Sequence, residues 1–408
     1  MEDGEQRSLN RRILFVDDEP DVLDGLENRL HRQKTEWDMV FVRGAEAALV
    51  ELARSPFDLV VSDMRMPGMD GGTLLRRVQK SHPGTARVIL SGYAELNDVV
   101  KAFDVAHQFV AKPCDGAVLC AVIDRACALQ QLLNDPELRA VVGSLDRLPT
   151  APEVYLKVTR ELARKGATPQ EIADTIQEDL MMSARLLQVV NSPHFGLDRP
   201  AVSVLDAISA LGVDFVHSLI LSTHILVLIN NPQINQAEID RIQKDSLLTA
   251  RMAKRMMASH GDVEAAFSAA LVHDIGQMVL LTAFPEKYRQ ALAVATAAGQ
   301  QRSFAEIERA QFGATHAQVG GCLLGTWGLP AEIAEAVTFH QEPELHVGNG
   351  ALTAVIHTAS TLTEAWLENL PLSQARIDLP FLERVGLAQE LPRWREIAAE
   401  ILGGKPSA

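Results

Sequence analysis

Five polar residues in the first third of the chain have the types and spacing to support phosphoryl chemistry. Each stands at or next to the end of a short apolar run: Asp17, Asp18, Asp63, Ser91 and Lys112. If these runs are parallel strands, their carboxyl ends share one edge of a sheet, and the five side chains converge there. A single acid after a strand is usually a solvated turn residue, but five matching positions argue against that explanation.

Three carboxylates held together repel one another unless a cation lies among them. Oxygen ligands that leave room for water and a phosphoryl group suit Mg²⁺. Lys112 could then pair with a phosphoryl oxygen, and Asp63 could act as the nucleophile that forms an acyl phosphate. The pattern therefore predicts a magnesium-dependent phosphoacceptor at Asp63.

The elements that must position these residues alternate between strand and helix. Helical periodicity separates the apolar runs, and a long last helix is expected over 115–134. We expect strands at 13–17, 39–42, 58–63, 87–91 and 109–112. This alternation predicts an α/β, doubly wound, five-stranded parallel sheet with helices on both faces.

Residues 12–134 resemble a response-regulator receiver domain. Four motifs match that family in order and spacing: Asp17-Asp18, the segment DMRMPGMDG that begins at Asp63, Ser91-Gly92 and Lys112-Pro113. The resemblance implies a flavodoxin-like fold. It also implies that a sensor histidine kinase or a phosphotransfer protein phosphorylates Asp63.

The same resemblance assigns the remaining roles around the phosphoacceptor. It implies that Mg²⁺ is held by Asp17, Asp18, Asp63 and the carbonyl of Arg65. Ser91 and Lys112 would bind the phosphoryl group, and Phe109 would change rotamer as part of the switch. Phe109 has no hydroxyl group, so a hydrogen bond that a tyrosine would make there is absent.

The spacing of apolar residues over 135–408 predicts helices, and no strand pattern is found there. Helix starts are expected near Pro152, Pro169, Met182, Val204, Gln236, Val263, Phe284, Phe304, Thr315, Pro330, Gly350 and Leu391. Thr168 before Pro169, with Glu171 three residues later, is typical of a capped helix start. We therefore expect an all-α second region after a linker over 135–147.

Histidines in this region form a second candidate site. His273-Asp274 ends an apolar helical stretch, where both side chains could reach one metal ion, and His316 and His340 could complete its ligands. The alternative is that these histidines are ordinary core or surface residues with satisfied hydrogen bonds.

Residues 148–345 resemble the HDOD domain, a relative of the HD phosphohydrolases. The resemblance rests on LPTAPEVYLKV (148–158), SARLLQVVNSPHFG (183–196), SVLDAISALG (203–212), LVHDIG (271–276), THAQVGGCLLGTWGLP (315–330) and EAVTFH (335–340). Residues 346–402 would form a helical extension packed on this domain.

Compared with the metal-ligand pattern of the HD phosphohydrolases, this site is degenerate. His273, Asp274, His316 and His340 fall near expected positions, but Asp245 stands where the family favours histidine. Ser360 replaces the late aspartate, which removes the bridging carboxylate that a two-metal centre needs. Metal binding at this site is left open, and hydrolysis is not expected.

The whole pattern predicts a response regulator whose HDOD output is non-catalytic and acts on an unknown protein partner. Two alternatives stay open. The output could be a metal-dependent phosphohydrolase or cyclic-dinucleotide phosphodiesterase, or the helical region could bind a nucleotide or metal as a second input.

The apolar face of the helix that joins the two regions allows two interpretations. Leu119, Val122, Ala126, Leu129 and Leu133 form a heptad seam of about two repeats, short of what defines a coiled coil. This face could pack on the receiver sheet. It could also belong to a continuous signalling helix that supports a homodimer.

Composition limits the partners. The 408 residues carry 38 Lys and Arg against 53 Asp and Glu, a net charge of −15, which argues against a basic DNA-binding face. The first residues, MEDGEQRSLNRR, contain no apolar signal segment, and the apolar stretch Leu219–Ile229 is too short to span a membrane. It predicts a buried helix instead, and we expect a cytoplasmic protein without membrane contact.

Overall fold

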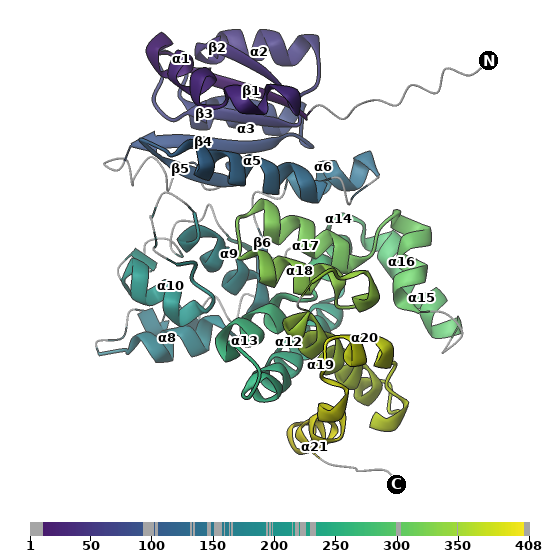
Figure 1. Cartoon of the computed structure of the whole chain (residues 1–408). Helices are drawn as coiled ribbons and strands as arrows, with labels where there is room; N and C mark the ends of the chain where they lie inside the picture. Colours follow the sequence, from purple (N-terminus) through teal and green to yellow (C-terminus); the bar gives the residue numbers. More distant parts are fainter. Residues whose placement is uncertain are drawn as a thin grey trace, which may run out of the picture.

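The computed structural model describes residues 11–92, 105–130, 135–144, 166–192, 199–213, 234–298, 303–348 and 350–403, with a few shorter stretches between them. Figure 1 shows two domains, a sheet domain above and a larger helical domain below. The predicted helix between the fourth and fifth strands lies largely outside the described residues.

The sheet domain contains five parallel strands, as predicted. They are β1 (Arg11–Asp17), β2 (Trp37–Arg43), β3 (Leu59–Asp63), β4 (Ala86–Gly92) and β5 (Gln108–Lys112). Their spatial order is β2-β1-β3-β4-β5, so β2 and β5 form the two edges. The crossover from β2 to β3 passes over β1 and places the carboxyl ends of β1 and β3 side by side.

Helices cover both faces of this sheet. They are α1 (Pro20–Arg29), α2 (Gly44–Arg54), α3 (Gly71–Ser81) and α5 (Gly116–Gln130), with a 3₁₀ helix, η1, at His31–Thr35. Ile13 and Phe15 belong to the apolar cluster that includes α1 and α5. Leu14 and Val16 point to the opposite face and join the cluster that includes α2 and α3. The alternation along β1 therefore confirms the doubly wound arrangement.

The helical domain matches the predicted helix starts closely. Its helices are α6 (Pro136–Ser144), α8 (Pro169–Ile176), α9 (Leu180–Val190), α10 (Val204–Leu211), α12 (Gln236–Met257), α13 (Val263–Val272), α14 (Ile275–Ala283), α15 (Pro285–Ala298), α16 (Phe304–Phe312), α17 (His316–Thr326), α18 (Ala331–Phe339), α19 (Ala351–Leu367), α20 (Leu379–Arg384) and α21 (Leu391–Ile401). Thr168 and Glu171 form the predicted capping box of α8. The expected helix at Pro152 lies outside the described residues.

Two short strands correct the all-α expectation. β6 (Leu148–Thr150) and β7 (Leu226–Leu228) pair in parallel. Residues 226–228 lie inside the apolar stretch that we expected to be a buried helix, so that expectation is wrong for these residues. Short apolar runs have no periodicity that separates a buried strand from a buried helix.

The apolar core of the helical domain includes a segment with the length of a membrane span. Val263–Ala283, which comprises α13 and α14, is long and apolar enough by composition, and 94% of its most apolar window is buried inside the domain. Such burial is typical of a core helix. Trp394 of α21 and Phe381 of α20 join the same core, so the carboxyl-terminal helices pack on this domain.

Helix α5 lies between the sheet and the helical domain (Figure 1). Leu119, Val122 and Ala126 belong to the cluster under the sheet, whereas Leu133 belongs to the core of the helical domain. Helix α5 ends at Gln130 and α6 begins at Pro136. The part of the heptad seam that lies on α5 therefore packs within the sheet domain, and Leu133 beyond the helix packs in the helical domain.

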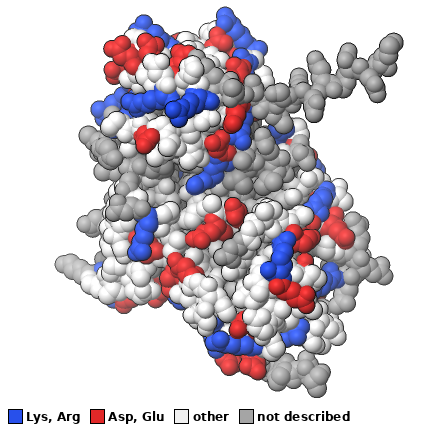
Figure 2. Space-filling model, in the orientation of Figure 1, with Lys and Arg blue, Asp and Glu red and all other residues white. Residues whose placement is uncertain are grey.

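Acidic and basic side chains alternate over both domains on the face drawn in Figure 2. A row of Lys and Arg crosses the sheet domain on that face, with acidic groups on either side. This mixture of signs agrees with a net negative charge that is not confined to one half of the chain.

Candidate functional sites

The ends of three strands bring predicted residues together. Lys112, the last residue of β5, donates a hydrogen bond from Nζ to Asp17 Oδ2 (2.7 Å) and another to the carboxylate of Asp63. Asp17 is the last residue of β1 and is 1% exposed, and Asp63 is the last residue of β3 and is 8% exposed. We call these three residues the phosphoacceptor cluster.

Backbone groups orient the two carboxylates of this cluster. The Arg65 N–H donates to Asp63 Oδ2 (2.7 Å), and the Glu19 N–H donates to Asp17 Oδ1 (2.9 Å). Burial raises the pKa of Asp63, and Lys112 opposes that shift. Burial alone would lower the pKa of Lys112, but its hydrogen bonds to Asp17 and Asp63 raise that pKa above its usual value. The lysine therefore stays charged and balances the acids.

The donor set at this edge fits Mg²⁺. Asp17 and Asp63 offer two buried carboxylates that share one lysine, which leaves net negative charge in the cluster. Asp18 is partly buried beside them. The ligand roles of Asp18 and of the Arg65 carbonyl stay predictions.

The predicted switch residues lie on the two strands nearest the helical domain. Ser91 is fully buried on β4, and Phe109 on β5 is 1% exposed. Ser192, just beyond α9, donates from Oγ to the Phe109 carbonyl (2.9 Å), and Gln188 of α9 donates from Nε2 to the His107 carbonyl (3.1 Å). Sequence reasoning missed these links, because a serine and a glutamine on a helix carry no signal of a strand eighty residues away.

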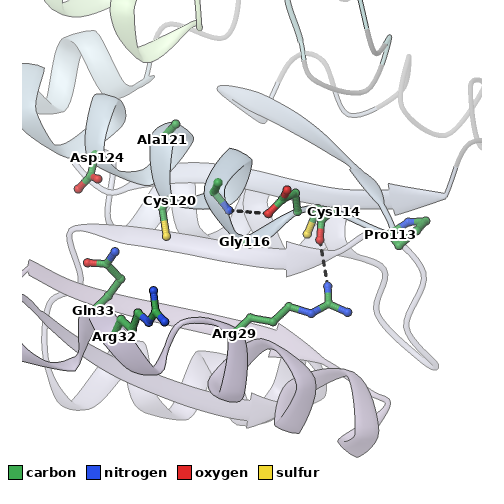
Figure 3. A pocket seen from close by; sticks show the side chains of 11 residues that line it. Arg29, Arg32, Gln33, Pro113, Cys114, Gly116, Cys120, Ala121 and Asp124 are labelled. Carbon is green, nitrogen blue, oxygen red and sulfur yellow. Dashed lines mark hydrogen bonds between the residues drawn. The ribbon is translucent and has the colours of Figure 1, made fainter.

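A groove of about 960 Å³ lies on another side of the sheet domain, between α1 and α5 (Figure 3). Arg29 and Arg32 line one wall, and Cys114, Cys120 and Asp124 line the other. The Arg29 guanidinium donates from Nη1 to the Cys114 carbonyl (2.9 Å). Because Cys114 follows Lys112-Pro113, the groove begins near the phosphoacceptor cluster.

The structure also gathers the predicted histidine site. His273 and Asp274 link α13 to α14, His316 is the first residue of α17, and His340 follows α18. All four are at most 3% exposed. Asp274 lies 3.5 Å from His273 Nε2 and 3.1 Å from His316 Nε2. The His340 ring is 5.0 Å from that of His273 and 5.4 Å from that of His316, centroid to centroid. We call these four residues the histidine cluster.

Hydrogen bonds fix the orientation of the imidazoles. His273 donates from Nδ1 to the Ala270 carbonyl (2.7 Å), and His340 donates from Nδ1 to the Val337 carbonyl (2.8 Å). Each neutral ring then keeps a lone pair on Nε2. The buried Nε2 of His340 has no hydrogen-bond partner among the described residues.

Glu308 of α16 supports His316 and was not predicted. Its carboxylate accepts from His316 Nδ1 (2.8 Å) and from the His316 backbone N–H (3.0 Å), while the Glu308 side chain is fully buried. A carboxylate behind a histidine is the usual support of a metal-ligating imidazole. No motif in the sequence marks Glu308, since its role depends on helix packing.

The cluster fits one metal ion rather than two. His273, Asp274 and His340 each offer a ligand atom, and these atoms lie within 4.8 Å of one another. Imidazole and carboxylate ligands suit Zn²⁺ and related transition metals. Asp245 is buried nearby, but Thr249 donates to it and burial raises its pKa well above the usual value, with Asp274 adding to the shift. A protonated Asp245 is a poor ligand for a second ion.

Charge in the cluster concentrates on one ion pair. Burial alone would raise the pKa of Asp274, but the neighbouring imidazoles hold it below its usual range. Burial alone would lower the pKa of His316, but Glu308 and Asp274 raise it to about 10. Burial lowers the pKa of His273 and of His340. At neutral pH the metal-free cluster therefore holds one imidazolium between two carboxylates.

Comparison with known families and proteins identifies both domains. The response regulator receiver domain model matches residues 13–124, and the HDOD domain model matches residues 148–343. The chain is 36% identical over 151 residues to response regulator protein PilR of Pseudomonas aeruginosa, covering 34% of each chain. It is 32% identical over 158 residues to response regulator protein FleR of the same organism, covering 38% of this chain and 32% of that protein.

A solved structure aligns over more of the chain. The MmoQ response regulator of Methylococcus capsulatus is 26% identical, with a TM-score of 0.49, and the match covers 63% of this chain and 98% of that one. The chain spans only about a third of the length of PilR and FleR. From the two domain models, the chain belongs to the response regulators and combines a receiver domain with an HDOD domain.

Proposed function

We propose that this protein is a phosphorylation-controlled regulator in which Asp63 accepts a phosphoryl group from a sensor histidine kinase or phosphotransfer protein. The HDOD domain is then an output that works through protein contacts and not through hydrolysis. The observation that carries this proposal is the phosphoacceptor cluster, where Lys112 bridges two buried carboxylates at one sheet edge.

The contact between the domains supplies a route for the signal. Strand β5 is an edge strand. The carbonyl of His107, just before β5, accepts a hydrogen bond from Gln188, and that of Phe109 on β5 accepts one from Ser192. The Phe109 side chain belongs to an apolar cluster that also contains residues of α9. A change at the end of β5 therefore acts directly on the output domain.

Strand β4 has its own link to the helical domain. Arg87 is 1% exposed and donates from Nε to the Val105 carbonyl (2.6 Å) and from Nη2 to the Gly143 carbonyl at the end of α6. Strand β4 also carries Ser91, so both predicted switch residues lie on strands that contact the output. Since a buried guanidinium that loses an acceptor is costly, these contacts favour discrete states over gradual motion.

The groove between α1 and α5 is the surface that we assign to the phosphodonor (Figure 3). It opens beside the segment that follows Lys112, so a protein seated there reaches the edge that carries Asp63. Arg29 and Arg32 would pair with acidic groups of the donor. Charge reversal of both should slow transfer from a donor protein but leave phosphorylation by a small acyl phosphate unchanged.

The direct test is chemical. Wild-type protein and an Asp63→Asn variant are incubated with acetyl phosphate and Mg²⁺, and intact mass is measured. We expect one added phosphoryl group on the wild type, none on the variant, and a change in limited proteolysis only in the wild type. A phosphoryl group of equal stoichiometry on Asp63→Asn would contradict the assignment.

A second candidate function is a metal-binding input at the histidine cluster. The specific observation is the convergence of His273, Asp274 and His340, together with the unpartnered Nε2 of His340. Metal analysis of the purified full chain, compared with His340→Ala, tests it. One equivalent of metal in the wild type that is lost in the variant supports a mononuclear site, and two equivalents with phosphodiesterase activity would instead establish a hydrolase.

A further inference from the structure

We propose that α17, with the turn 327–330 that follows it, couples the receiver domain to the histidine cluster. Phosphorylation of Asp63 and occupancy of the cluster would then influence each other. This inference rests on the proposed function and names the regulation of its two sites. Its support is a continuous set of contacts from β5 and α5 to His316 and His340.

The receiver domain holds the carboxyl end of α17. Gln108 of β5 donates from Nε2 to the Thr326 carbonyl (2.9 Å). Arg125 of α5 donates from Nη1 to the carbonyls of Gly328 (3.5 Å) and Leu329 (3.4 Å). The last carbonyls of a helix lack partners within the helix and carry partial negative charge, so an amide donor is a suitable cap. The receiver domain thus caps the last carbonyl of α17 through Gln108 and holds the turn that follows through Arg125.

The turn itself is shaped for this contact. Gly328 has a φ of +81°, which L side chains rarely adopt, and a Cβ atom there would lie 3.2 Å from the Gln108 side chain. Trp327 is 1% exposed, and the Arg185 guanidinium of α9 lies 5.3 Å from its ring centroid. The turn is therefore held on one side by β5 and α5 and on the other by α9.

Both helices that leave the turn lead to the histidine cluster. Helix α17 has eleven residues and its first residue is His316, so the cluster lies about 15 Å from the turn along the axis. Helix α18 runs from Ala331 to Phe339 and is followed by His340. Two of the four cluster residues thus lie at the far ends of the two helices that flank the turn held by the receiver domain.

Packing around α17 leaves little room to absorb a displacement. A Cβ atom on Gly276 would meet the His316 carbonyl at 1.9 Å, and one on Gly321 would meet Thr338 Oγ1 at 1.8 Å. The helices therefore approach each other through their backbones. Interiors packed this closely transmit displacement instead of dissipating it. His273 follows α13 and Glu308 lies on α16, so movement of α17 changes the distances from His316 to both of them.

Thermodynamic linkage makes the coupling reciprocal. The test uses the full chain with Mg²⁺ and beryllofluoride as the phosphoryl mimic, and hydrogen–deuterium exchange is followed in peptides that cover 273–276 and the first turn of α17. In the reverse direction Zn²⁺ alone is added, and exchange is followed over β5. We expect at least a fivefold change in exchange rate in each direction, and a similar change in Zn²⁺ affinity with beryllofluoride.

Matched variants isolate the contacts. Gln108→Ala combined with Arg125→Ala should abolish both responses while Asp63 still accepts a phosphoryl group. The control combines Gln389→Ala with Arg393→Ala, which removes the same side-chain types from exposed positions near the carboxyl end of the helical domain, and should keep both responses. Equal responses in the two double variants, or no response of α17 in the wild type, overturn the coupling.

Failure of the proposed function gives a different pattern. If the wild type takes no phosphoryl group at Asp63, the proposed function fails, and the Zn²⁺ direction alone decides the coupling. If Zn²⁺ does not bind, the beryllofluoride effect on α17 decides it. If neither site takes its probe, the coupling is overturned as well.

Discussion

At the scale of single residues, both sites are built from buried charges balanced by specific partners. Lys112 bridges Asp17 and Asp63 at the sheet edge. His316 lies between Glu308 and Asp274 in the helical core. In each case one cation serves two carboxylates, so the site keeps a negative charge that a metal ion could neutralise. The two sites differ in donor type, because oxygen ligands suit Mg²⁺ and imidazoles suit transition metals.

The raised pKa of His316 gives a pH-dependent stability. Its folded pKa of about 10 lies above the ordinary histidine value of 6.5, so the charged form stabilises the folded state fully below pH 6.5. That contribution is lost at up to about 1.4 kcal/mol per pH unit as the pH rises towards 10. With EDTA present, wild type should exceed His316→Gln in free energy of unfolding at pH 6, and the difference should shrink by pH 10.

Urea denaturation at constant ionic strength measures this difference. Other groups titrate over the same range in both proteins, and the variant therefore serves as the reference for them. A wild-type advantage that stays constant from pH 6 to pH 10 would show that His316 is not charged in the folded state.

The residues that could be predicted from sequence are those whose position follows from strand or helix ends. Asp63 and Lys112 were found because parallel strands place their carboxyl ends at one edge. His273 and Asp274 were found because they are adjacent. Glu308 and Gln108 were not predicted, because each forms a hydrogen bond with a residue of a different helix or domain. No local sequence pattern indicates such a contact.

At the scale of elements, glycines set how closely the helices of the output domain approach. Gly276, Gly320 and Gly321 lie where α14, α17 and α18 meet, and a Cβ atom at each would come closer to a neighbour than ordinary contact allows. The sequence predicted the starts of α17 and α18, near Thr315 and Pro330, but not the separate start of α14 at Ile275. It did not predict the two-stranded pair β6–β7, because three-residue apolar runs carry too little periodicity.

Gly321→Ala should destabilise the protein more than an ordinary helix substitution does. The added methyl would lie 1.8 Å from Thr338 Oγ1 and 3.0 Å from its Cα atom, so backbone must move. We expect a loss of about 1–3 kcal/mol in the free energy of unfolding. Gly25→Ala in α1 is the control, because a Cβ there has nothing within 4 Å and alanine favours helix by about 1 kcal/mol.

Thermal and urea unfolding of both variants check this expectation. Gly321→Ala should lower the midpoint, whereas Gly25→Ala should leave it unchanged or raise it slightly. Equal midpoints for the two variants would mean that α17 and α18 have room to separate, and the rigid packing that the coupling requires would be lost.

At the scale of the whole molecule, the receiver domain covers part of the output domain with an edge strand. Carbonyls at the start of β5 accept hydrogen bonds from Gln188 and Ser192, while Gln108 and Arg125 donate to the end of α17 and to the turn after it. Donors and acceptors therefore alternate across the contact. Such a surface is specific, because separation leaves polar groups on both sides to be hydrated again. We interpret the described arrangement as a closed state in which part of the output surface is covered.

Removal of the hydrogen-bond donors of Gln188 and Ser192 should separate the two domains without altering the phosphoacceptor cluster. Gln188→Ala combined with Ser192→Ala leaves the His107 and Phe109 carbonyls buried without these donors, at roughly 1–3 kcal/mol each. A closed population held by a few kcal/mol then shifts towards separated domains. Small-angle X-ray scattering should show a larger radius of gyration without any phosphoryl group, while acetyl phosphate still modifies Asp63.

The matched control is Ser373→Ala combined with Gln374→Ala, which removes the same side-chain types from exposed positions and should leave the radius of gyration unchanged. Phosphorylation of the wild type should move its scattering towards that of the open variant if the switch releases the output surface. Phosphorylation could instead make the wild type more compact while the Gln188→Ala, Ser192→Ala variant opens. That result would show that phosphorylation strengthens the contact between the two domains. The same hydrogen bonds to β5 would then hold the active state together.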